Sequence, residues 1–572
     1  MIKFIVPCVA CILLISTRSL AQQEKTSQPK PAPFDTIFKA EKRWMVFPVK
    51  NGATKRKVEL WIDGKLCRYI DIELAEGQAD WLSYLDISEW KGKDLDLRVN
   101  LLSPGAKTFS ATLQSDTDTN EAPLYKEKLR GQFHFSPKRG WTNDPNGLAY
   151  YNGEYHLFFQ HNPYGTEWGN MHWGHAVSKD LLHWKELGEA LYPDETGTMF
   201  SGSGVVDSNN TSGLGKDGKA PMVLFYTSDR SWTQGLAWTT DGRTFEKSDR
   251  AAVPRFSMGN RDPKVIWHEP TKKWIMVYYA EANRQLRSHT MRFYTSPNLK
   301  DWTFSSSIKG GQGRDNYLFE CPEFFELPVE GNPAQRKWIL TGANNEYAIG
   351  NFDGKVFTPE VERLKGERGR DFYASQTFNN EPNGRRIEIG WWRTRTNKEG
   401  MTFNQSQSIP LEIKLVNSDS GLRLSRTPVK ELESLRMKTF NIGKATLAEN
   451  GTNPLAKVNA GALELRAALE PGKSREITFS IHGKTIVYDV DKKQLTCDGV
   501  NAPAPLKKGR LGLIIYADRT GFEIFTEDGL LFMPVNVNLD MNDPLISVSA
   551  KGGRARINNL AVYELKSIWD DQ

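Results

Sequence analysis

Three acidic residues of this 572-residue chain share a similar local setting. Asp144 occurs in W-T-N-D-P-N-G, Asp262 in N-R-D-P-K-V and Glu320 in L-F-E-C-P-E-F-F. A Pro follows each of them within two residues, and an aromatic residue precedes two of them within three positions. Successive members are 118 and 58 residues apart. This pattern favours a group of carboxylates that meet in the folded chain.

Each of these residues, taken alone, also has a structural interpretation. An Asp before Pro most often forms a turn, and D-P-N-G predicts a tight turn with Gly147 at positive φ. A Glu beside Cys-Pro is typical of a buried partner for an Arg. Only the three together, in phase with the repeat described below, favour a chemical role.

A cluster of several carboxylates with no metal ligands nearby suits cleavage of a glycosidic bond. That reaction needs one ionised and one protonated carboxyl group. Burial and mutual repulsion make the pKa values of two such carboxyl groups different, so that one stays protonated while the other is ionised. Arg261, beside Asp262, is expected to keep that carboxylate ionised. The Phe and Cys that flank Glu320 are apolar and favour its neutral form. Residue types therefore predict Glu320 as proton donor and Asp144 as nucleophile.

A repeated unit must bring these residues together. A strand, a turn of Ser, Thr, Asp, Asn or Gly, and an aromatic residue recur at intervals of 61, 57 and 55 residues. The closing aromatic residues are Trp184, Phe245, Trp302 and Phe357. About four strands fit into each interval, as in a β-propeller blade. With a further strand set up to about residue 410, the sequence predicts five blades over 128–425, with the carboxylates in the first, third and fourth.

The flanking segments predict two further β domains, so the expected fold class is all-β. Short alternating runs over 34–122 indicate a small sandwich-like N-terminal domain, and 438–567 indicates a C-terminal β-sandwich. R-T-P-V-K-E-L-E-S-L-R predicts a linker helix over 426–437. A glycan-binding role for the N-terminal domain competes with a packing role. Strand-like surroundings favour packing for its residues Trp44, Trp61, Trp81 and Trp90.

The first residues predict export. One Lys, an apolar run and Ser-Leu-Ala at 19–21 are typical of a signal peptide over 1–21 with cleavage after Ala21, followed by a linker over 22–33. We expect a periplasmic or extracellular protein without a membrane span. Cys67, Cys321 and Cys497 remain, too few for a disulfide framework, and no metal-binding cluster is evident. The net charge of +6 comes from mixed residues, which argues against a nucleic-acid partner.

Six motifs together resemble glycoside hydrolase family 32, the β-fructosidases. They are N-D-P-N-G, L-F-F-Q-H-N-P, F-S-G-S-G-V-V-D, R-D-P-K-V, E-C-P-E-F-F and D-F-Y-A-S-Q-T-F, in the family's order. The resemblance covers roughly residues 130–436. It implies a five-bladed propeller with a following sandwich, hydrolysis with retention of configuration, a bound terminal fructosyl unit and no cofactor. Thr142 and Gly204 depart from the usual pattern, and the N-terminal domain is an addition to it.

The resemblance also assigns roles by matching motif. Asp144 is the expected nucleophile, Glu320 the general acid/base and Asp262 the stabiliser of the transition state. Retention implies carboxyl groups about 5 to 5.5 Å apart. The residues expected to line the sugar pocket are Asn143, Gln160, Trp168, Ser201, Arg261 and Trp392.

The expected substrate is a fructan or fructo-oligosaccharide. F-S-G-S-G-V-V-D resembles the version in exo-acting fructanases, so exo-cleavage of levan or inulin is favoured, with sucrose and short oligosaccharides also accepted. Endo-cleavage stays open. Two other hypotheses are a related five-bladed arabinosidase or xylosidase, which N-D-P-N-G and E-C-P disfavour, and a non-catalytic sugar-binding propeller, which three intact carboxylates disfavour.

Overall fold

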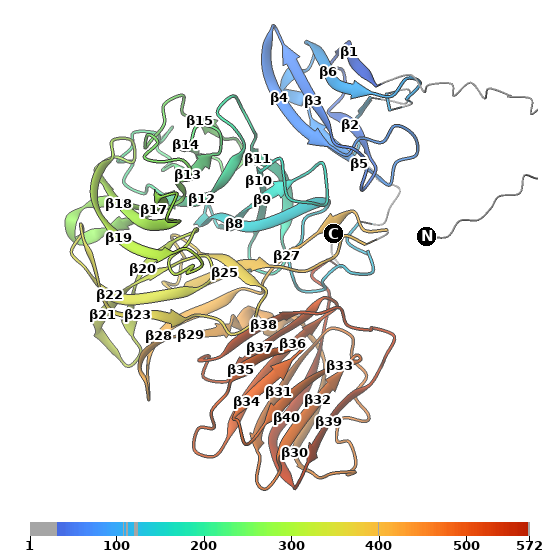
Figure 1. Cartoon of the computed structure of the whole chain (residues 1–572), viewed down its shortest axis with the longest axis vertical. Coiled ribbons are helices and arrows are strands. Elements are labelled where there is room, and N and C mark those ends of the chain that lie inside the picture. Colours follow the sequence, from blue (N-terminus) through green and yellow to red (C-terminus); the bar gives the residue numbers. More distant parts are fainter. Residues whose placement is uncertain (1–30, 107, 110–112, 119–123, 399, 570–572) are drawn as a thin grey trace, which may run out of the picture.

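The computed structural model describes residues 31–569, except 107, 110–112, 119–123 and 399. The chain forms three β domains in sequence order: the N-terminal domain (blue), the propeller (cyan to yellow) and the C-terminal sandwich (orange to red) (Figure 1). The expected signal peptide, residues 1–21, lies outside the described residues. The first strand begins at Ala32 and so overlaps the last two residues of the predicted linker over 22–33, of which residues 22–30 lie outside the described residues.

The N-terminal domain consists of two facing sheets, with strand orders β1-β6-β3-β4 and β5-β2-β7. Alternating buried and half-buried residues along β2 and β5 give each sheet one apolar face. Trp81 and Trp90 are buried in this core, as the packing interpretation predicted, whereas Trp44 and Trp61 are only half-buried. The elements are β1 (Ala32–Lys39), β2 (Trp44–Val49), β3 (Arg56–Ile62), β4 (Lys65–Ile72), β5 (Trp81–Asp86), the 3-10 helix η1 (Ser88–Trp90), β6 (Asp94–Leu102) and β7 (Gln114–Ser115).

The propeller has five blades, each built outward from an inner strand. The first three are β8 (Gly140–Tyr151), β9 (Glu154–Asn162), β10 (His172–Ser178) and β11 (Lys185–Leu191); β12 (Met199–Val206), β13 (Met222–Ser228), β14 (Thr233–Thr239) and β15 (Glu246–Lys247); and β16 (Arg261–His268), β17 (Lys273–Asn283), β18 (Ser288–Ser296) and β19 (Thr303–Gln312), with η2 (Glu269–Thr271). The last two are β20 (Glu323–Val329), β21 (Asn332–Thr341), β22 (Glu346–Phe352) and β23 (Phe357–Lys365); and β24 (Phe372–Thr377), β25 (Arg386–Trp392), β28 (Leu411–Ser418) and β29 (Gly421–Pro428).

The inner strands form a closed ring, in which β8 contacts β12, β12 contacts β16, β16 contacts β20, β20 contacts β24 and β24 contacts β8. Two short strands follow β25, namely β26 (Phe403–Asn404) and β27 (Ser406–Gln407). Because β26 pairs in parallel with the start of β8, the last blade is tied to the first. The expected five-bladed propeller is confirmed.

The sequence repeat corresponds to the third strand of each blade and the turn that follows. Its four units fall on β10, β14, β18 and β22 with the start of β23. Strands near the axis lie between neighbouring blades, so β9 is buried along almost its whole length. Outer strands such as β23 face solvent and alternate or lose their apolar residues. The repeat was visible because the first four blades share the same kind of turn between their third and fourth strands.

The C-terminal domain is a sandwich of a six-stranded and a five-stranded sheet. The predicted linker helix over 426–437 is wrong in extent and type: Arg426 belongs to β29, and only the 3-10 helix η3 (Lys430–Leu435) separates the domains. The strands are β30 (Arg436–Leu447), β31 (Leu463–Glu470), β32 (Glu476–Ile481), β33 (Lys484–Asp489), β34 (Gln494–Cys497), β35 (Val500–Pro503), β36 (Leu511–Asp518), β37 (Gly521–Thr526), β38 (Phe532–Asn536), β39 (Ile546–Lys551) and β40 (Ala555–Leu565).

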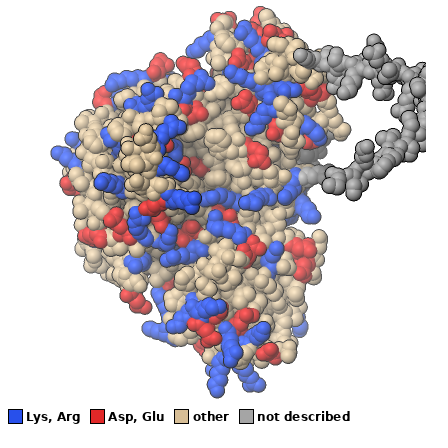
Figure 2. All heavy atoms as spheres, viewed as in Figure 1, with Lys and Arg blue, Asp and Glu red and all other residues tan. Residues whose placement is uncertain are grey.

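Charged side chains of both signs are interspersed over the face shown in Figure 2. Within the described part of the chain, no helix is long and apolar enough to cross a membrane. In the same residues no group of three or more His, Cys, Asp or Glu side chains is arranged to hold a metal ion.

A buried histidine joins the propeller to the sandwich. His134 Nδ1 lies 2.8 Å from Asp518 Oδ2, and its Nε2 lies 2.8 Å from Glu523 Oε2, with all three side chains almost fully buried. Burial alone would lower the pKa of His134, but its hydrogen bonds with the two carboxylates raise it above the ordinary value. Burial alone would raise the pKa of Asp518, but the hydrogen bond from His134 lowers it.

Replacing His134 by Gln is expected to reduce the free energy of unfolding by about 3 to 5 kcal/mol, because two buried carboxylates lose their cation. The stabilisation by protonated His134 is fully present below the pKa of an unfolded His and is lost as pH rises through the raised folded pKa. Denaturant unfolding should therefore show the largest difference from the wild type at mildly acidic pH.

His183→Gln is the matched control. His183 pairs with Asp180 at 2.7 Å, but its side chain is 32% exposed. We expect its loss to cost less than about 1 kcal/mol. Equal costs for the two variants, or no change of the His134→Gln cost with pH, would contradict the ionic account.

Candidate active site

Asp144 lies on the innermost strand of the first blade, not in a turn. The predicted tight turn at D-P-N-G is wrong, because these residues continue β8. The pairing of β8 with β9 shifts between Thr142 and Pro145, which is a β-bulge around Asp144. Gly147 has φ 58°, as predicted, and a Cβ there would lie 2.6 Å from the Phe158 ring. The segment is therefore an irregular strand.

The same irregularity recurs on other inner strands. Register shifts occur around Ser201 in β12, around Asp262 in β16 and around Ala374 in β24. Asp262 and Glu320, the latter just before β20, have left-handed backbones with φ 63° and 55°. Such conformations are unusual for residues other than Gly and concentrate at functional sites. Bulges re-aim side chains, so the ring of inner strands turns these groups toward one place.

Asp144 is held by donors from three blades. Ser201 Oγ donates to Asp144 Oδ2 at 2.6 Å, and Asn143 Nδ2 donates to Asp144 Oδ1 at 3.1 Å. The Cys321 thiol lies 3.4 Å from Asp144 Oδ2. Trp141 Nε1 donates to Asn143 Oδ1 at 2.9 Å and so fixes the amide that faces Asp144. The Trp at the start of the motif thus orients the hydrogen-bonding partner of Asp144.

Cys321 links the three carboxylates. Its backbone N–H donates to Asp262 Oδ2 at 3.0 Å, while its thiol contacts Asp144 and its chain neighbour is Glu320. Asp262 is buried, Asp144 is half-buried, and the Glu320 side chain is 25% exposed. The predicted convergence of Asp144, Asp262 and Glu320 is what the structure shows.

The expected partnership of Arg261 is different in the fold. Its Nη2 donates to Glu320 Oε1 at 2.6 Å and its Nε at 3.1 Å, whereas the nearest Asp262 oxygen is 3.8 Å away. Tyr373 Oη donates to Glu320 Oε2 at 2.8 Å. Glu320 therefore accepts two charged or polar donors instead of lying in the apolar surroundings that its neighbours predicted. The side chain of Arg261 is long enough to cross from the third blade to the fourth.

Burial dominates the electrostatics of the two Asp residues. It raises the pKa of Asp144, against the hydrogen bonds of Ser201 and Asn143, which favour the carboxylate. It also raises the pKa of Asp262, although Arg261 acts in the opposite direction; the nearby Glu320 and Asp144 carboxylates add to the rise. Arg261 acts in the expected direction, toward the ionised carboxylate, but desolvation outweighs it.

The predicted pocket residues separate into two groups. Asn143, Ser201 and Arg261 contact the carboxylates directly. Gln160 is buried and donates to the Met199 carbonyl at 2.9 Å, which ties the first blade to the second near Ser201. Trp168 lies in the β9–β10 loop with 54% of its surface exposed and its ring edge-on to Phe200 at 6.0 Å.

Trp392 is not a wall of this site. It is fully buried, and its ring centroid lies 3.9 Å from that of His134 at the contact with the sandwich. Its neighbour Trp391 pairs in register with Tyr373 and lies edge-on to Trp141 at 6.0 Å. Successive residues of a strand point to opposite faces of the sheet. A difference of one position along β25 therefore decides whether a Trp lies in the core or at the site.

Two contributors escaped the sequence predictions. Tyr373 lies in the quoted motif D-F-Y-A-S-Q-T-F, and only its contact with Glu320 distinguishes it from a packing residue. Cys321 was interpreted as an apolar neighbour, yet its backbone and thiol hold two of the carboxylates. A polar aromatic residue on the first strand of the fifth blade was the one available signal for Tyr373.

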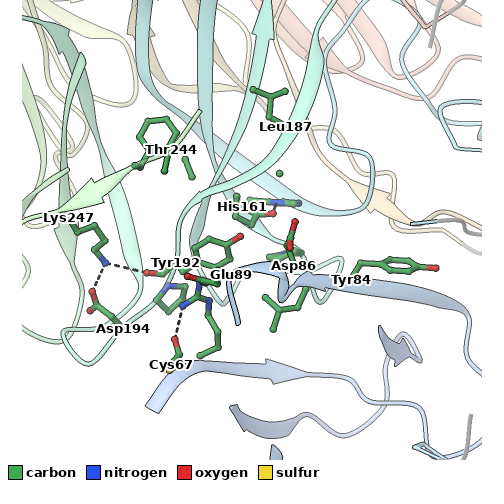
Figure 3. Close-up of a pocket in the computed structure, with 18 of the residues that line it drawn as sticks. Cys67, Tyr84, Asp86, Glu89, His161, Leu187, Tyr192, Asp194, Thr244 and Lys247 are labelled. Atoms are coloured by element: carbon green, nitrogen blue, oxygen red, sulfur yellow. Dashed lines mark hydrogen bonds and ion pairs between the residues drawn. The ribbon is translucent and has the colours of Figure 1, made fainter. Parts of the chain in front are cut away.

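A large cavity of about 1730 Å³ lies elsewhere, between the N-terminal domain and the first two blades. Its labelled residues include Cys67, Glu89 and Tyr192, and Lys247 forms an ion pair with Asp194 across one side (Figure 3). None of the predicted site residues lines it. The cluster of Asp144, Asp262 and Glu320, not this cavity, is the candidate active site.

Comparisons with known proteins agree with this arrangement. The family model "Glycosyl hydrolases family 32 N-terminal domain" matches residues 134–428, more than half of the chain and nearly all of the propeller. The chain belongs to glycoside hydrolase family 32. It is therefore a glycoside hydrolase of the β-fructosidase type, as the motifs predicted.

Family 32 relatives cover most of the chain. A levanase of Bacillus subtilis (strain 168) is 38% identical over 508 residues, which are 81% of this chain and 74% of the levanase. An extracellular exo-inulinase of Aspergillus awamori is 31% identical over 527 residues, 78% of this chain and 96% of the relative. The crystal structure of exo-inulinase from Aspergillus awamori superposes with a TM-score of 0.68 at 28% identity, covering 78% of this chain and all of that one.

The family 32 model begins at residue 134, so this chain's own N-terminal β domain, which consists of β1 to β7, lies outside it. The match ends at residue 428, at the last residue of β29. The N-terminal domain is thus an addition to the part of the chain that defines the family.

The Ser201 hydroxyl provides a test of the electrostatics. Ser201→Ala removes a donor that favours ionised Asp144, so the pKa of Asp144 should rise further. If Asp144 is the nucleophile, as the motifs predict, it must be ionised to react, and the acid limb of the pH profile of kcat/KM is expected to move to higher pH. The accompanying loss near the optimum should be about tenfold.

Ser203→Ala is the control on the same strand. Ser203 is buried and joins β12 to β16 through Pro263 and Val265, without contact to Asp144. It is expected to lower stability and to leave the acid limb in place. An acid limb that does not move in Ser201→Ala would contradict the assignment of Asp144 as the ionised group.

Proposed function

We propose that this chain is an exported, retaining, exo-acting fructan β-fructosidase that releases terminal fructose from levan or inulin and also accepts sucrose and short fructo-oligosaccharides. The supporting observation is the group of Asp144, Asp262 and Glu320, held by Ser201, Arg261, Cys321 and Tyr373 where the five inner strands converge. Relatives named levanase and exo-inulinase support the substrate class.

In the proposed reaction, Asp144 attacks the anomeric C2 of a terminal β-fructofuranoside while Glu320 protonates the leaving oxygen. A covalent fructosyl ester of Asp144 results, and the leaving alcohol departs with the proton. Glu320 then removes a proton from water, whose oxygen attacks C2 and releases fructose. Asp262, buried and fixed by the Cys321 N–H, holds ring hydroxyls.

The Arg261–Glu320 ion pair must loosen before this proton transfer. Arg261 Nη2 and Tyr373 Oη both donate to Glu320. A proton donor has to carry its own proton, so these donors need other acceptors in the complex. Hydroxyl groups of the bound sugar supply these acceptors, and exclusion of water by the substrate strengthens the new contacts.

Timed product analysis tests the proposal. With levan and inulin as separate substrates, fructose should be the sole early product. An early ladder of oligosaccharides would show endo-cleavage and overturn the exo assignment. Absence of any reducing sugar from levan, inulin and sucrose would overturn the fructan assignment.

Export has its own test. Relatives described as extracellular support it, and the mature protein should begin at Gln22 when recovered from the periplasm or the medium. Export would be contradicted if the active protein is found in the cytoplasm and N-terminal sequencing shows that residues 1–21 are still attached.

A further inference from the structure

The β9–β10 loop, residues 163–171, carries Trp168 and is held by the N-terminal domain. Its exposed indole lies next to Phe200, whose neighbour Ser201 donates to Asp144. The loop begins where β9 ends at Asn162 and returns to the blade at His172. Its shape therefore decides where a large aromatic surface lies relative to the carboxylates.

The N-terminal domain holds the start of this loop. The Tyr164 ring is buried within the apolar core of that domain, edge-on to Phe47 at 6.0 Å. Ser83 Oγ, itself 1% exposed, donates to the Pro163 carbonyl at 2.7 Å. A residue of the propeller thus completes the core of the neighbouring domain, which makes the contact a fixed one.

The same domain holds the end of the loop through a reciprocal pair of hydrogen bonds. Asp71 N donates to Asn170 Oδ1 at 2.7 Å, and Asn170 Nδ2 donates to the Asp71 carbonyl at 2.5 Å. Asp71 lies on β4, the edge strand of its sheet, whose outer N–H and C=O groups need partners. The Asn170 amide supplies both, in the way that a neighbouring strand would.

The middle of the loop is held by the propeller itself. Asn162 Nδ2 donates to the Glu167 carbonyl at 2.8 Å, and Asn404 Nδ2 donates to the Thr166 carbonyl at 2.9 Å. Residues on both sides of Trp168 are thus fixed, from the propeller before it and from the N-terminal domain after it.

We propose that the N-terminal domain is a positioning element for the substrate site, and that Asn170 is the residue through which it places Trp168. This inference rests on the proposed function in one respect, the contact of Trp168 with bound fructan. A loop ordered before binding saves the conformational entropy of ordering it in the complex. The domain added to the family fold therefore acts on affinity without touching the carboxylates.

Asn170→Gly tests the proposal without straining the backbone. Asn170 has φ 46°, a left-handed conformation that Gly adopts freely, so the change removes the side chain without straining the backbone. The lost amide forms hydrogen bonds with Asp71 and also donates to Asn162 Oδ1 at 3.1 Å within the propeller. KM for levan, inulin and short fructo-oligosaccharides should rise about three- to tenfold, while kcat changes less than about twofold. Amide hydrogen exchange over 163–171 should become faster in the full-length chain.

Asn152→Gly is the matched control. Asn152 is also left-handed, with φ 51°, but lies in the exposed β8–β9 turn. It should change neither KM nor exchange in the 163–171 loop. Ser83→Ala, which removes the other anchor, should reproduce the KM and exchange effects of Asn170→Gly without touching Asn170.

A double-mutant cycle with Trp168→Ala separates positioning from general destabilisation. If Asn170 acts through Trp168, Asn170→Gly should add little to KM once the indole is gone. An equal rise in KM in both backgrounds, or an unchanged KM with unchanged exchange, would overturn the proposal. If no fructoside is hydrolysed, the proposed function fails, while the exchange measurement still decides whether the N-terminal domain orders the loop.

Discussion

Replacing Asp144 by Asn is expected to lower kcat about 10⁵-fold or more while the fold and substrate binding persist. Asn keeps the size of the side chain and can keep a hydrogen bond with Ser201 Oγ. It cannot form the ester with C2, so the reaction loses its first step. The measurement is steady-state kinetics on sucrose and levan, with circular dichroism to verify the fold.

The covalent intermediate allows a direct test of the same assignment. Acid quenching of the wild type during turnover should trap one fructosyl unit on the peptide that contains Asp144, detected by mass spectrometry. The Asp144→Asn protein should carry none and should bind sucrose with a Kd within about tenfold of the wild-type KM. Near-normal turnover of the variant, or an adduct on Asp262, would remove Asp144 from the nucleophile role.

Replacing Glu320 by Gln is expected to lower kcat/KM about 10²- to 10⁴-fold for natural fructosides, because no group protonates the leaving oxygen. The loss should be much smaller for a fructoside with a nitrophenol leaving group, which departs without a proton. Deglycosylation then becomes slow, because water loses its general base. Added azide needs no base and should restore turnover, with fructosyl azide as the product.

Glu323→Gln is the control for this experiment. Glu323 lies three residues further along, is buried and pairs with Lys264 at 2.8 Å. Its replacement should reduce stability, since Lys264 keeps a buried charge without a partner. Neither leaving-group dependence nor azide rescue should accompany it. If azide fails to restore activity in Glu320→Gln, or restores it equally in Glu323→Gln, Glu320 is not the acid/base.

Trp391 and Trp392 are adjacent in the chain but lie in different surroundings, which the sequence alone did not predict. The G-W-W motif indicated that a Trp forms part of the site, but it offers two adjacent residues. Adjacent residues on a strand face opposite sides, so the pairing of β25 with β24 places Trp391 opposite Tyr373 and Trp392 in the core. Which of the two Trp residues faces the site depends on the register between β25 and β24, and the sequence of one strand does not show that register.

The fold class and the acidic residues of the site were predictable from the order of residues alone. The blade repeat is local, because each strand–turn–aromatic unit lies within one blade. Asp144, Asp262 and Glu320 lie on or just before the inner strands of three blades. The positive φ of Gly147 was also predicted from local sequence, because Gly adopts positive φ without a steric cost.

How those groups are held depends on contacts between blades in the folded chain. The bulges at Asp144 and Asp262 arise from pairing with the next strand, and D-P-N-G alone is equally compatible with a turn. Arg261 pairs with Glu320 because two blades bring them within reach, although Asp262 is its neighbour in the chain. Hydrogen bonds and desolvation depend on distances in space, and residues from different blades acquire those distances only when the ring closes.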